Sequence, residues 1–435
     1  MSASFAIVGS GPSGMYAADA LLKNFPDCQI DVFDKLPMPF GLIRYGVAPD
    51  HFKTKNTARQ FSRTLDLDQV RYLGNVEIGR DLSVDELKDN YDAVLYATGM
   101  YNDRLLGIPG EGLPGVYGAC AFVGWYNAHP DYRDIDPMLD GGNVAVIGIG
   151  NVALDVCRVL VKTRAEMQDT DIAAHALEAI EKMPIEEVHM FGRRGPVEAG
   201  FTPKELGEIF DLERCAVIVN PDQIPGEVTG DFEGREKGVK EKNLATLREL
   251  AAQDKPEKPV RLQFQFYASP VEILGSGRVE GIRLERTEVI DGKAVATGKT
   301  FDVPCCSVIT AIGYYADPPE GLPLRGATIE NVYGRVRDNI YVVGWAKRGS
   351  TGTIPTNGPD SRSVVELLIE DISAGAIELG KPGGTAINTL LSSRNIRVVS
   401  REDVNTIRAA EVANAVDGHP WEKFTRIDDM LAVLD

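Results

Sequence analysis

The sequence predicts an α/β protein built from two Rossmann-like dinucleotide-binding folds. The main observation is a succession of a short apolar strand, a glycine-rich turn and a helix, which occurs twice, beginning near residues 4 and 143. Further short apolar runs recur along the chain, as expected for parallel strands that are buried on both faces. A chain of 435 residues is long enough for two or three domains. Its 43% hydrophobic and 25% charged residues are ordinary for a globular protein and exclude a disordered or collagen-like chain.

The first fold begins at residue 4. Residues 4–9 are predicted to form a strand, 15–23 a helix and 29–34 the next strand. The turn between the first strand and the helix reads Gly9-Ser-Gly-Pro-Ser-Gly14. Such a glycine pattern alone is weak evidence for a nucleotide-binding turn, and its position between a strand and a helix makes the evidence specific.

Each glycine of this turn has its own physical role. Gly9 permits the tight turn, Gly11 lets the backbone approach a pyrophosphate, and Gly14 lets the helix pack closely on the strand. The N–H groups of the first helical turn then face the phosphates. Asp34, which ends the second strand, lies 20 residues after Gly14 and can accept hydrogen bonds from a ribose. We therefore predict a bound dinucleotide here in preference to a merely structural turn.

The second fold repeats this pattern with one difference that concerns the coenzyme. Residues 143–148 are the predicted strand, Gly148-Ile-Gly-Asn-Val-Ala153 is the turn, and 152–163 is the helix. The next strand, 187–192, follows a polar, helix-prone excursion and ends on Arg193 and Arg194 instead of a ribose-binding acid. Two guanidinium groups at this point favour the 2′-phosphate of NADP, and no carboxylate is present to repel it.

Three more strands and two connectors complete the predicted organisation. Strands at 92–99, 307–313 and 339–344 end on glycine, and connectors rich in proline and glycine occupy 107–115 and 317–326. The simplest arrangement inserts the second fold into the first, with domains at 1–104 plus 320–435 and at 105–319. Residues 220–260 are charged and are predicted to be a loop.

Composition excludes several classes of function. A net charge of −18 makes nucleic acid and anionic lipid poor partners. The six cysteines include no C-x-x-C pair, which argues against a zinc ribbon or a dithiol centre, and Cys305 and Cys306 are predicted to be buried in a strand-like run. The longest apolar stretch, 143–161, is interrupted by polar residues, so no membrane insertion is expected. A strand begins almost at the first residue, which predicts a cytoplasmic protein without a leader.

At this point the sequence resembles the adrenodoxin-reductase-type NADPH:ferredoxin reductases, especially their bacterial members, over nearly its whole length. The landmarks that carry the resemblance are the first glycine turn, residues 39–51, 122–129, 150–155, 193–196 and 344–354. The resemblance implies a glutathione-reductase-like fold, FAD and NADP(H) as cofactors, and a ferredoxin-type iron–sulfur protein as the electron acceptor. A flavin suits this task because it accepts two electrons and releases them singly. We expect a monomer or weak dimer.

The resemblance also assigns residues to each cofactor. On the FAD side it implies Ser13, Asp34, Leu42, Val76, Trp345, Gly352, Thr353 and Ile354. On the NADP(H) side it implies Gly150, Asn151, Val152, Arg193, Arg194, Glu205 and Gly352. His51 and Glu208 fall on the family's active-site histidine and glutamate, which would orient the nicotinamide and relay a proton.

Some features depart from the family or leave alternatives open. Asp34 is one methylene shorter than the usual glutamate, the family's Asp-Trp pattern reads Asp403-Val404, and Arg408 stands where an acid is expected. Lys347, Arg348, Arg335 and Arg337 are candidate docking charges for an acidic ferredoxin. The alternatives are a flavoprotein reductase with another acceptor and a flavin-free NADP(H) sensor. A disulfide reductase or an electron-input subunit like that of glutamate synthase is disfavoured by the cysteine pattern.

Overall fold

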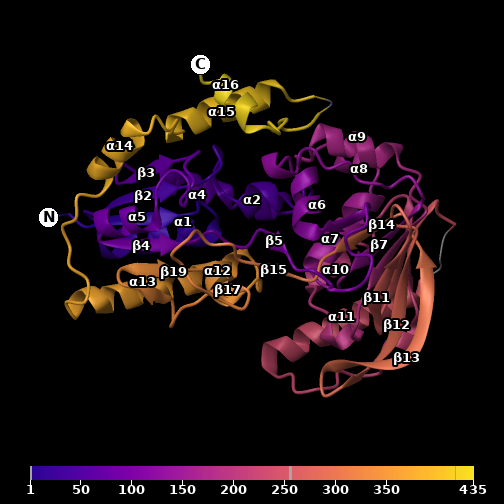
Figure 1. Ribbon diagram of the computed structural model, residues 1–435. Coiled ribbons are helices and arrows are strands. Elements are labelled where there is room, and N and C mark those ends of the chain that lie inside the picture. The colour runs from indigo at the N-terminus through magenta and orange to yellow at the C-terminus, as the bar shows by residue number, and fades with distance from the viewer. Residues whose placement is uncertain (1, 254–256, 417) are drawn as a thin grey trace. The chain divides into compact units, whose positions relative to one another are not determined.

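The computed structural model describes residues 2–253, 257–416 and 418–435 (Figure 1). The chain divides into two compact units. The first unit contains Met1–Asn102, Asn127–Pro130 and Gly313–Asp435, and the second contains Asp103–Tyr126 and Asp131–Ile312. The second unit is therefore inserted in the sequence of the first.

The first unit is built around a six-stranded sheet of order β18-β19-β4-β1-β2-β3. All of its pairs are parallel except β18 with β19. The strands are β1 (Ser4–Val8), β2 (Gln29–Phe33), β3 (Val70–Leu73), β4 (Ala93–Tyr96), β18 (Arg335–Arg337) and β19 (Ile340–Val342). Strand β1 is buried on both faces, with Phe5 and Ile7 in one core and Ala6 and Val8 in the other. This explains why every residue of β1 after Ser4 is apolar.

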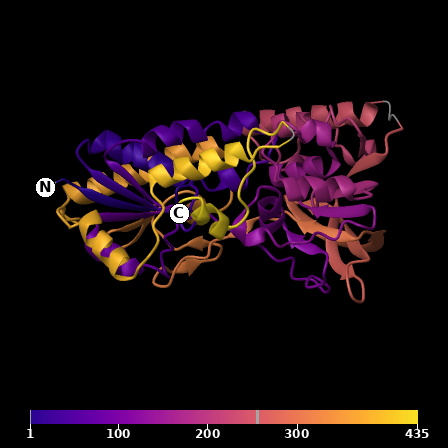
Figure 2. The same ribbon diagram turned by 90° about the horizontal axis from the view of Figure 1, so that it is seen from above.

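Helices cover both faces of this sheet. They are α1 (Pro12–Asn24), α2 (Leu42–Tyr45), α3 (Phe52–Lys55), α4 (Ala58–Leu65), α5 (Val84–Asn90), α12 (Trp345–Arg348), α13 (Asn357–Ser373), α14 (Gly384–Ser393), α15 (Arg401–Ala413) and α16 (Ile427–Ala432). Helix α1 packs against α13, so the C-terminal part of the chain completes the layer that begins at the first glycine turn. Figure 2 shows the yellow helix α15 beside the indigo elements of the same unit.

The second unit contains a parallel six-stranded sheet of order β6-β14-β7-β8-β10-β9. Its strands are β6 (Val116–Gly118), β7 (Asn143–Ile147), β8 (Glu187–Phe191), β9 (Cys215–Val219), β10 (Val260–Gln265) and β14 (Ser307–Thr310). A separate antiparallel sheet contains β11 (Ala268–Leu274), β12 (Gly281–Ile290) and β13 (Lys293–Pro304). This second sheet was not predicted from the sequence.

The helices of the second unit correct one prediction. They are α6 (Ala119–Tyr126), α7 (Asn151–Val161), α8 (Arg164–Met167), α9 (Ala174–Lys182), α10 (Pro203–Gly207) and α11 (Gly234–Ala252). The prediction of a loop over 220–260 was wrong, because α11 has 19 residues. Its first half has Val239 as its one large apolar residue, and its buried leucines begin only at Leu244, so the helical period is weak in the sequence.

Two further points concern function. Cys305 and Cys306 are buried as predicted, but they lie in the link between β13 and β14 and not within a strand. Within the described residues, no helix is long and apolar enough to cross a membrane, and no cluster of His, Cys, Asp and Glu could hold a metal ion.

Candidate functional site

Both glycine turns follow the strand at which the order of the sheet reverses. In the first unit β1 lies between β2 and β4, and in the second unit β7 lies between β8 and β14. Ligands of open α/β sheets bind beyond the carboxyl ends of the strands at such points. The topology therefore gives each unit one candidate nucleotide site.

The first turn has the geometry of a pyrophosphate cradle. Gly9 has a φ of 108°, and a Cβ there would lie 2.5 Å from the carbonyl oxygen of Ala97. A Cβ on Gly14 would lie 2.0 Å from the carbonyl oxygen of Gly9, so α1 approaches β1 too closely for any side chain. A Cβ on Gly11 would meet nothing within 4 Å, and the N-terminus of α1 has no side-chain cap. Open space beside uncapped N–H groups fits a phosphate.

Asp34 braces this turn from the end of β2. Its carboxylate accepts hydrogen bonds from the Ser10 N–H at 3.1 Å, from the Ser10 hydroxyl, and from the Leu36 N–H at 3.0 Å. Burial raises the pKa of the Asp34 carboxyl, and these hydrogen bonds act in the opposite direction. Ser10 was not among the predicted residues, although its place inside the turn could have indicated it.

The segment that follows Asp34 also lies against the turn. The Phe40 N–H donates to the Ser10 hydroxyl at 3.1 Å, and Phe40 has a φ of 83°. A Cβ on Gly41 would lie 3.3 Å from the Gly11 Cα. Leu42 begins α2 directly after this contact, and the buried Val76 donates its N–H to the Asp34 carbonyl at 2.9 Å. The two predicted apolar positions therefore lie in segments that adjoin the turn and Asp34.

The loop between β19 and α13 contacts the first glycine turn. A Cβ on Gly344 would lie 1.9 Å from the Ser13 hydroxyl, which donates to Asn357 Oδ1 at 3.0 Å. Arg348 donates to the same Asn357 oxygen at 2.7 Å. The Trp345 ring stacks on Tyr314 with centroids 6.0 Å apart. The loop continues through Gly352, which has a φ of 81°, to Thr353 and Ile354 at the start of a 3-10 turn.

The predicted docking charges are engaged inside the first unit. Lys347 donates to Asp360 at 2.9 Å, and Arg348 holds Asn357. Arg335 forms a two-bond pair with Asp371, and Arg337 contacts Asp85 at 3.1 Å. All four side chains therefore have intramolecular partners, and their part in docking stays a prediction.

His51 also belongs to the first unit. It precedes α3, its carbonyl accepts the N–H groups of Thr54 and Lys55 at 3.0 Å, and its side chain is buried. Glu208, the other predicted active-site residue, belongs to the second unit.

The second turn repeats the cradle. Gly148 has a φ of 142°, and a Cβ there would lie 2.4 Å from the Ala311 carbonyl oxygen. A Cβ on Gly150 would meet nothing within 4 Å, and α7 begins at Asn151 without a side-chain cap. Asn151 Oδ1 accepts the Thr202 N–H at 2.8 Å, which ties the start of α10 to the turn. This site likewise fits a dinucleotide.

Acidic and basic side chains meet between α7 and α10. The fully buried Arg158 contacts Asp155 at 2.9 Å and Glu208 at 3.5 Å. Glu208 also contacts Lys204 at 3.3 Å, while Glu205 Oε2 accepts the Thr202 hydroxyl at 2.6 Å. Glu205 is helical and Glu208 is the C-cap of the short α10. Arg158 is a partner that the sequence analysis missed.

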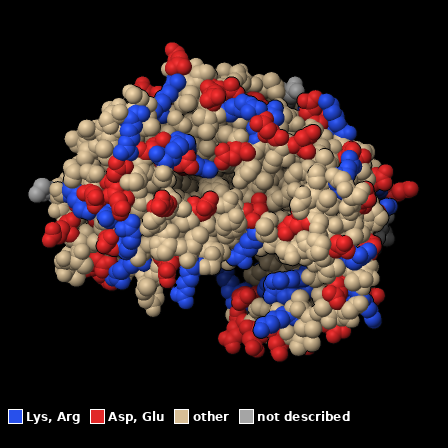
Figure 3. Space-filling view, viewed as in Figure 1, with Lys and Arg blue, Asp and Glu red and all other residues tan. Residues whose placement is uncertain are grey.

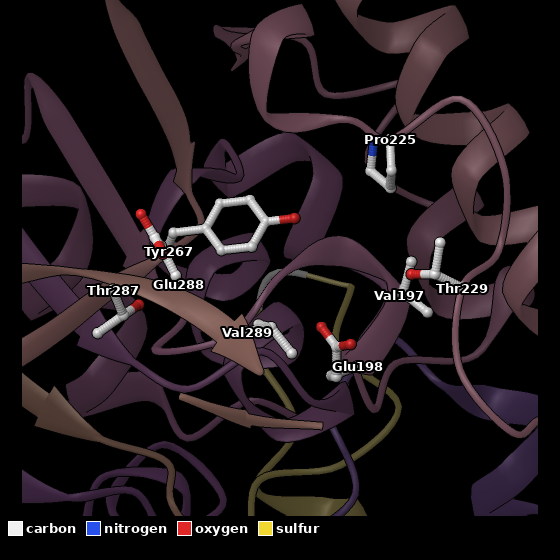
Figure 4. A pocket seen from close by; sticks show the side chains of 8 residues that line it. All are labelled: Val197, Glu198, Pro225, Thr229, Tyr267, Thr287, Glu288 and Val289. Carbon is white, nitrogen blue, oxygen red and sulfur yellow. The ribbon is translucent and has the colours of Figure 1, made fainter. Parts of the chain in front are cut away.

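Arg193 and Arg194 follow β8 in the same unit. Arg193 is exposed and has no side-chain partner within the described residues, whereas Arg194 donates to the Gly292 carbonyl at 3.3 Å. A cavity of about 440 Å³ borders this turn, and Figure 4 shows its eight lining side chains, among them Glu198, Tyr267 and Glu288. Two carboxylates in its lining make this cavity unsuitable for a phosphate.

Comparison with known proteins first defines the class. The family model for pyridine nucleotide-disulphide oxidoreductases matches residues 3–190. The fold and the two cradles agree with that class, which confirms the predicted α/β fold of two Rossmann-like, glutathione-reductase-like domains. All six cysteines are free in the structure.

Individual relatives then define the family. The chain is 40% identical to the NADPH-ferredoxin reductase FprA of Mycobacterium leprae, over 98% of this chain and 97% of that protein. It is 39% identical to the mitochondrial NADPH:adrenodoxin oxidoreductase of Homo sapiens, over 98% of this chain and 91% of that protein. The solved structure of Mycobacterium tuberculosis FprA in complex with NADPH matches with a TM-score of 0.94 and 39% identity, covering 99% of each chain. The chain belongs to the family of NADPH-ferredoxin and NADPH:adrenodoxin reductases.

Proposed function

We propose that this protein is an FAD-dependent oxidoreductase that takes hydride from NADPH and passes single electrons to a ferredoxin-type iron–sulfur protein. The observation that carries the proposal is the pair of glycine cradles in two separate folds, the second of which is followed by two arginines in place of an acid. The bound flavin supplies the conversion between a two-electron hydride and one-electron transfers. The relatives named above carry the corresponding names.

The proposed FAD domain is 1–104 plus 320–435, and the proposed NADP(H) domain is 105–319. The observed units, which change at 102/103 and 312/313 with a short return at 127–130, support this division. The residues proposed to hold FAD are Gly9, Gly11, Ser13, Gly14, Asp34, Leu42, Val76, Trp345, Gly352, Thr353 and Ile354. Because the Asp34 carboxylate already accepts bonds from Ser10 and Leu36, a ribose would use only its remaining lone pairs.

The coenzyme residues follow the second cradle. We assign Gly150, Asn151 and Val152 to the pyrophosphate, Arg193 and Arg194 to the 2′-phosphate, and Glu205 to a neighbouring polar contact. Arg193 has no competing partner within the part of the chain that the structure describes, so its fork is available for bidentate binding. Gly352 is assigned to both cofactors.

His51 and Glu208 are the proposed residues that orient the nicotinamide and relay a proton. Arg158 and Lys204 hold the Glu208 carboxylate from two sides, at 3.5 and 3.3 Å, which restricts its rotation. A restricted carboxylate suits positioning, and hydride transfer depends mainly on geometry.

The partner is proposed to dock on α3 and α4. Residues 51–65 contain Lys53, Lys55, Arg59 and Arg63 and no Asp or Glu, although acids outnumber bases in the chain by 64 to 46. Lys53, Arg59 and Arg63 pair with no carboxylate in the described ranges, and Phe52 beside them is 41% exposed. Figure 3 shows how closely acidic and basic side chains alternate on one face of the molecule. An unpaired basic surface with an exposed ring fits an acidic iron–sulfur protein.

Three measurements test the proposal. The purified protein should be yellow and release FAD on denaturation. A colourless protein would instead favour the alternative of a flavin-free NADP(H) sensor. Arg193→Ala with Arg194→Ala should raise the KM for NADPH far more than that for NADH. Reduction of cytochrome c through an added ferredoxin should slow as salt rises.

Charge reversal at Lys53, Arg59 and Arg63 should raise the KM for the ferredoxin while NADPH-dependent ferricyanide reduction stays constant. The matched control reverses Lys237 and Lys242, which are exposed on α11 in the second unit. A larger effect of the control than of the α3–α4 variants would refute this docking surface. We also propose that the protein is a monomer or weak dimer and that its location is cytoplasmic.

A further inference from the structure

Helix α11, which was not predicted from the sequence, is hydrogen-bonded through two side chains to residues 199–201, which follow Arg193 and Arg194 in the chain. The Lys240 ammonium donates to the Ala199 carbonyl at 2.8 Å, and the Asn243 amide donates to the Phe201 carbonyl at 2.9 Å. Residues three apart share one face of a helix. The two bonds therefore fix one face of α11 against residues 199–201.

Residue 200, between these two carbonyls, lies on the second glycine turn. The Gly200 N–H donates to the Ile149 carbonyl at 2.7 Å, and a Cβ on Gly200 would lie 3.8 Å from the Gly150 Cα. Lys240 is thus anchored one residue away from the contact with the pyrophosphate cradle. Burial lowers the pKa of the Lys240 amine, the carboxylates of Glu236 and Glu198 raise it, and Arg194 lowers it to a smaller extent.

The surroundings of Lys240 leave its charge incompletely compensated. It is half-buried, its ammonium lies 5.4 Å from the centre of the Phe232 ring, and it has no ion pair within the described residues. The carboxylates of Glu236 and Glu198 favour its charged form, but neither forms an ion pair with it within the described residues. A half-buried ammonium without an ion-pair partner costs free energy, which a phosphate would offset.

We propose that Lys240 is a third cation of the coenzyme site and a determinant of the preference for a 2′-phosphorylated nucleotide. It would act together with Arg193 and Arg194, the arginines as planar forks and Lys240 as a point charge. This inference rests on the proposed NADP(H) role of the second cradle.

The test is nucleotide binding, measured by calorimetry on the complete protein. Loss of one charge-assisted hydrogen bond is worth about 1.5–3 kcal/mol, or roughly 10- to 150-fold in Kd. Lys240→Met should weaken binding of adenosine 2′,5′-bisphosphate by at least about 10-fold and that of AMP by less than about 2-fold, and Lys240→Arg should restore most of the difference. Lys242→Met, exposed on the same helix, is the control and should change neither Kd.

A purely structural role is tested by Asn243→Ala, which removes the neighbouring fastening without removing charge. If Asn243→Ala lowers the 2′,5′-bisphosphate preference as much as Lys240→Met does, or if Lys240→Met affects both nucleotides equally or neither, the inference is wrong. If Arg193→Ala with Arg194→Ala also leaves the preference intact, the proposed NADP(H) site itself fails. If only the arginine variant abolishes it, the site stands and Lys240 is excluded.

Discussion

Substitution of single glycines in the first turn should separate folding from flavin binding. Gly14→Ala places a Cβ 2.0 Å from the Gly9 carbonyl oxygen and 3.0 Å from Ile7 Cγ2, so backbone must move. Overpacking of this kind costs about 1–3 kcal/mol or more. We expect Gly14→Ala to lower the free energy of unfolding even of the flavin-free protein.

Gly11→Ala should behave differently. Gly11 has a φ of −69° and a ψ of −179°, which alanine adopts easily, and a Cβ there meets no atom within 4 Å. Alanine is a poorer N-cap than glycine by about 0.5 kcal/mol, but it restricts the unfolded chain by about 0.4–1 kcal/mol. The two effects nearly cancel, so the flavin-free protein should keep its stability.

The flavin itself should report the difference. In Gly11→Ala the new Cβ would occupy the space proposed for the pyrophosphate, and one lost charge-assisted hydrogen bond costs about 1.5–3 kcal/mol, or roughly 10- to 150-fold in Kd. The assay combines the flavin-to-protein ratio after purification with thermal melting at rising FAD concentration. Gly112→Ala, at an exposed glycine with open space, is the control. A Gly11→Ala protein that binds FAD as tightly as the control would show that the pyrophosphate does not lie against this turn.

Two further predictions concern pH and charge burial. The Asp103 carboxylate accepts the N–H groups at the start of α6, at 2.8 Å from Cys120 and 3.3 Å from Ala121, and burial raises its pKa to about 6. Because the folded-state pKa of Asp103 lies above its unfolded value, this residue contributes stability that is lost as pH rises. The free energy of unfolding of the wild type relative to Asp103→Asn should therefore fall by up to about 3 kcal/mol between pH 4 and pH 7. If chemical denaturation gives the same difference between the two proteins at every pH, the prediction is wrong. Glu411→Gln should cost about 3–5 kcal/mol because Arg44, bonded through both of its terminal nitrogens to the fully buried Glu411, would remain as an uncompensated charge. The double variant Arg44→Met with Glu411→Leu should recover most of that loss in the same denaturation measurement.

The parts of the fold that the sequence predicted are those with a strong local signal. Both β-α-β units were predicted with their turns in place, because an unbroken apolar run and a glycine turn together leave few alternatives. The antiparallel sheet was missed because β13, with residues such as Lys293, Thr300 and Asp302, is largely exposed and carries no clear apolar alternation. Helix α11 was missed for a similar reason, since its apolar face is confined to its second half.

The roles of charged side chains were harder to predict because they depend on partners distant in the sequence. Arg337 reads as a surface charge until the fold brings it to Asp85, which lies 252 positions away. Asp34 was predicted as a ribose acid from its spacing, but its bonds to Ser10 make it a brace for the turn as well. A sequence gives the charge of a residue, and only tertiary structure shows which charge neutralises it.

Because carboxylates outnumber basic side chains in this protein, a lysine or arginine without an acidic partner can indicate a binding site for an anion. With 64 carboxylates for 46 lysines and arginines, a basic side chain on this protein should usually find an acidic partner, as Lys347 and Arg335 do. Within the described residues, Arg193 and Lys240 form no such pair, as is also true of Lys53, Arg59 and Arg63 on α3 and α4. Arg193 and Lys240 both belong to the unit with the second cradle. A site for an anion requires cations whose charge no carboxylate of the protein neutralises. Replacing both by neutral residues should therefore affect folding stability little and should chiefly remove affinity for phosphate.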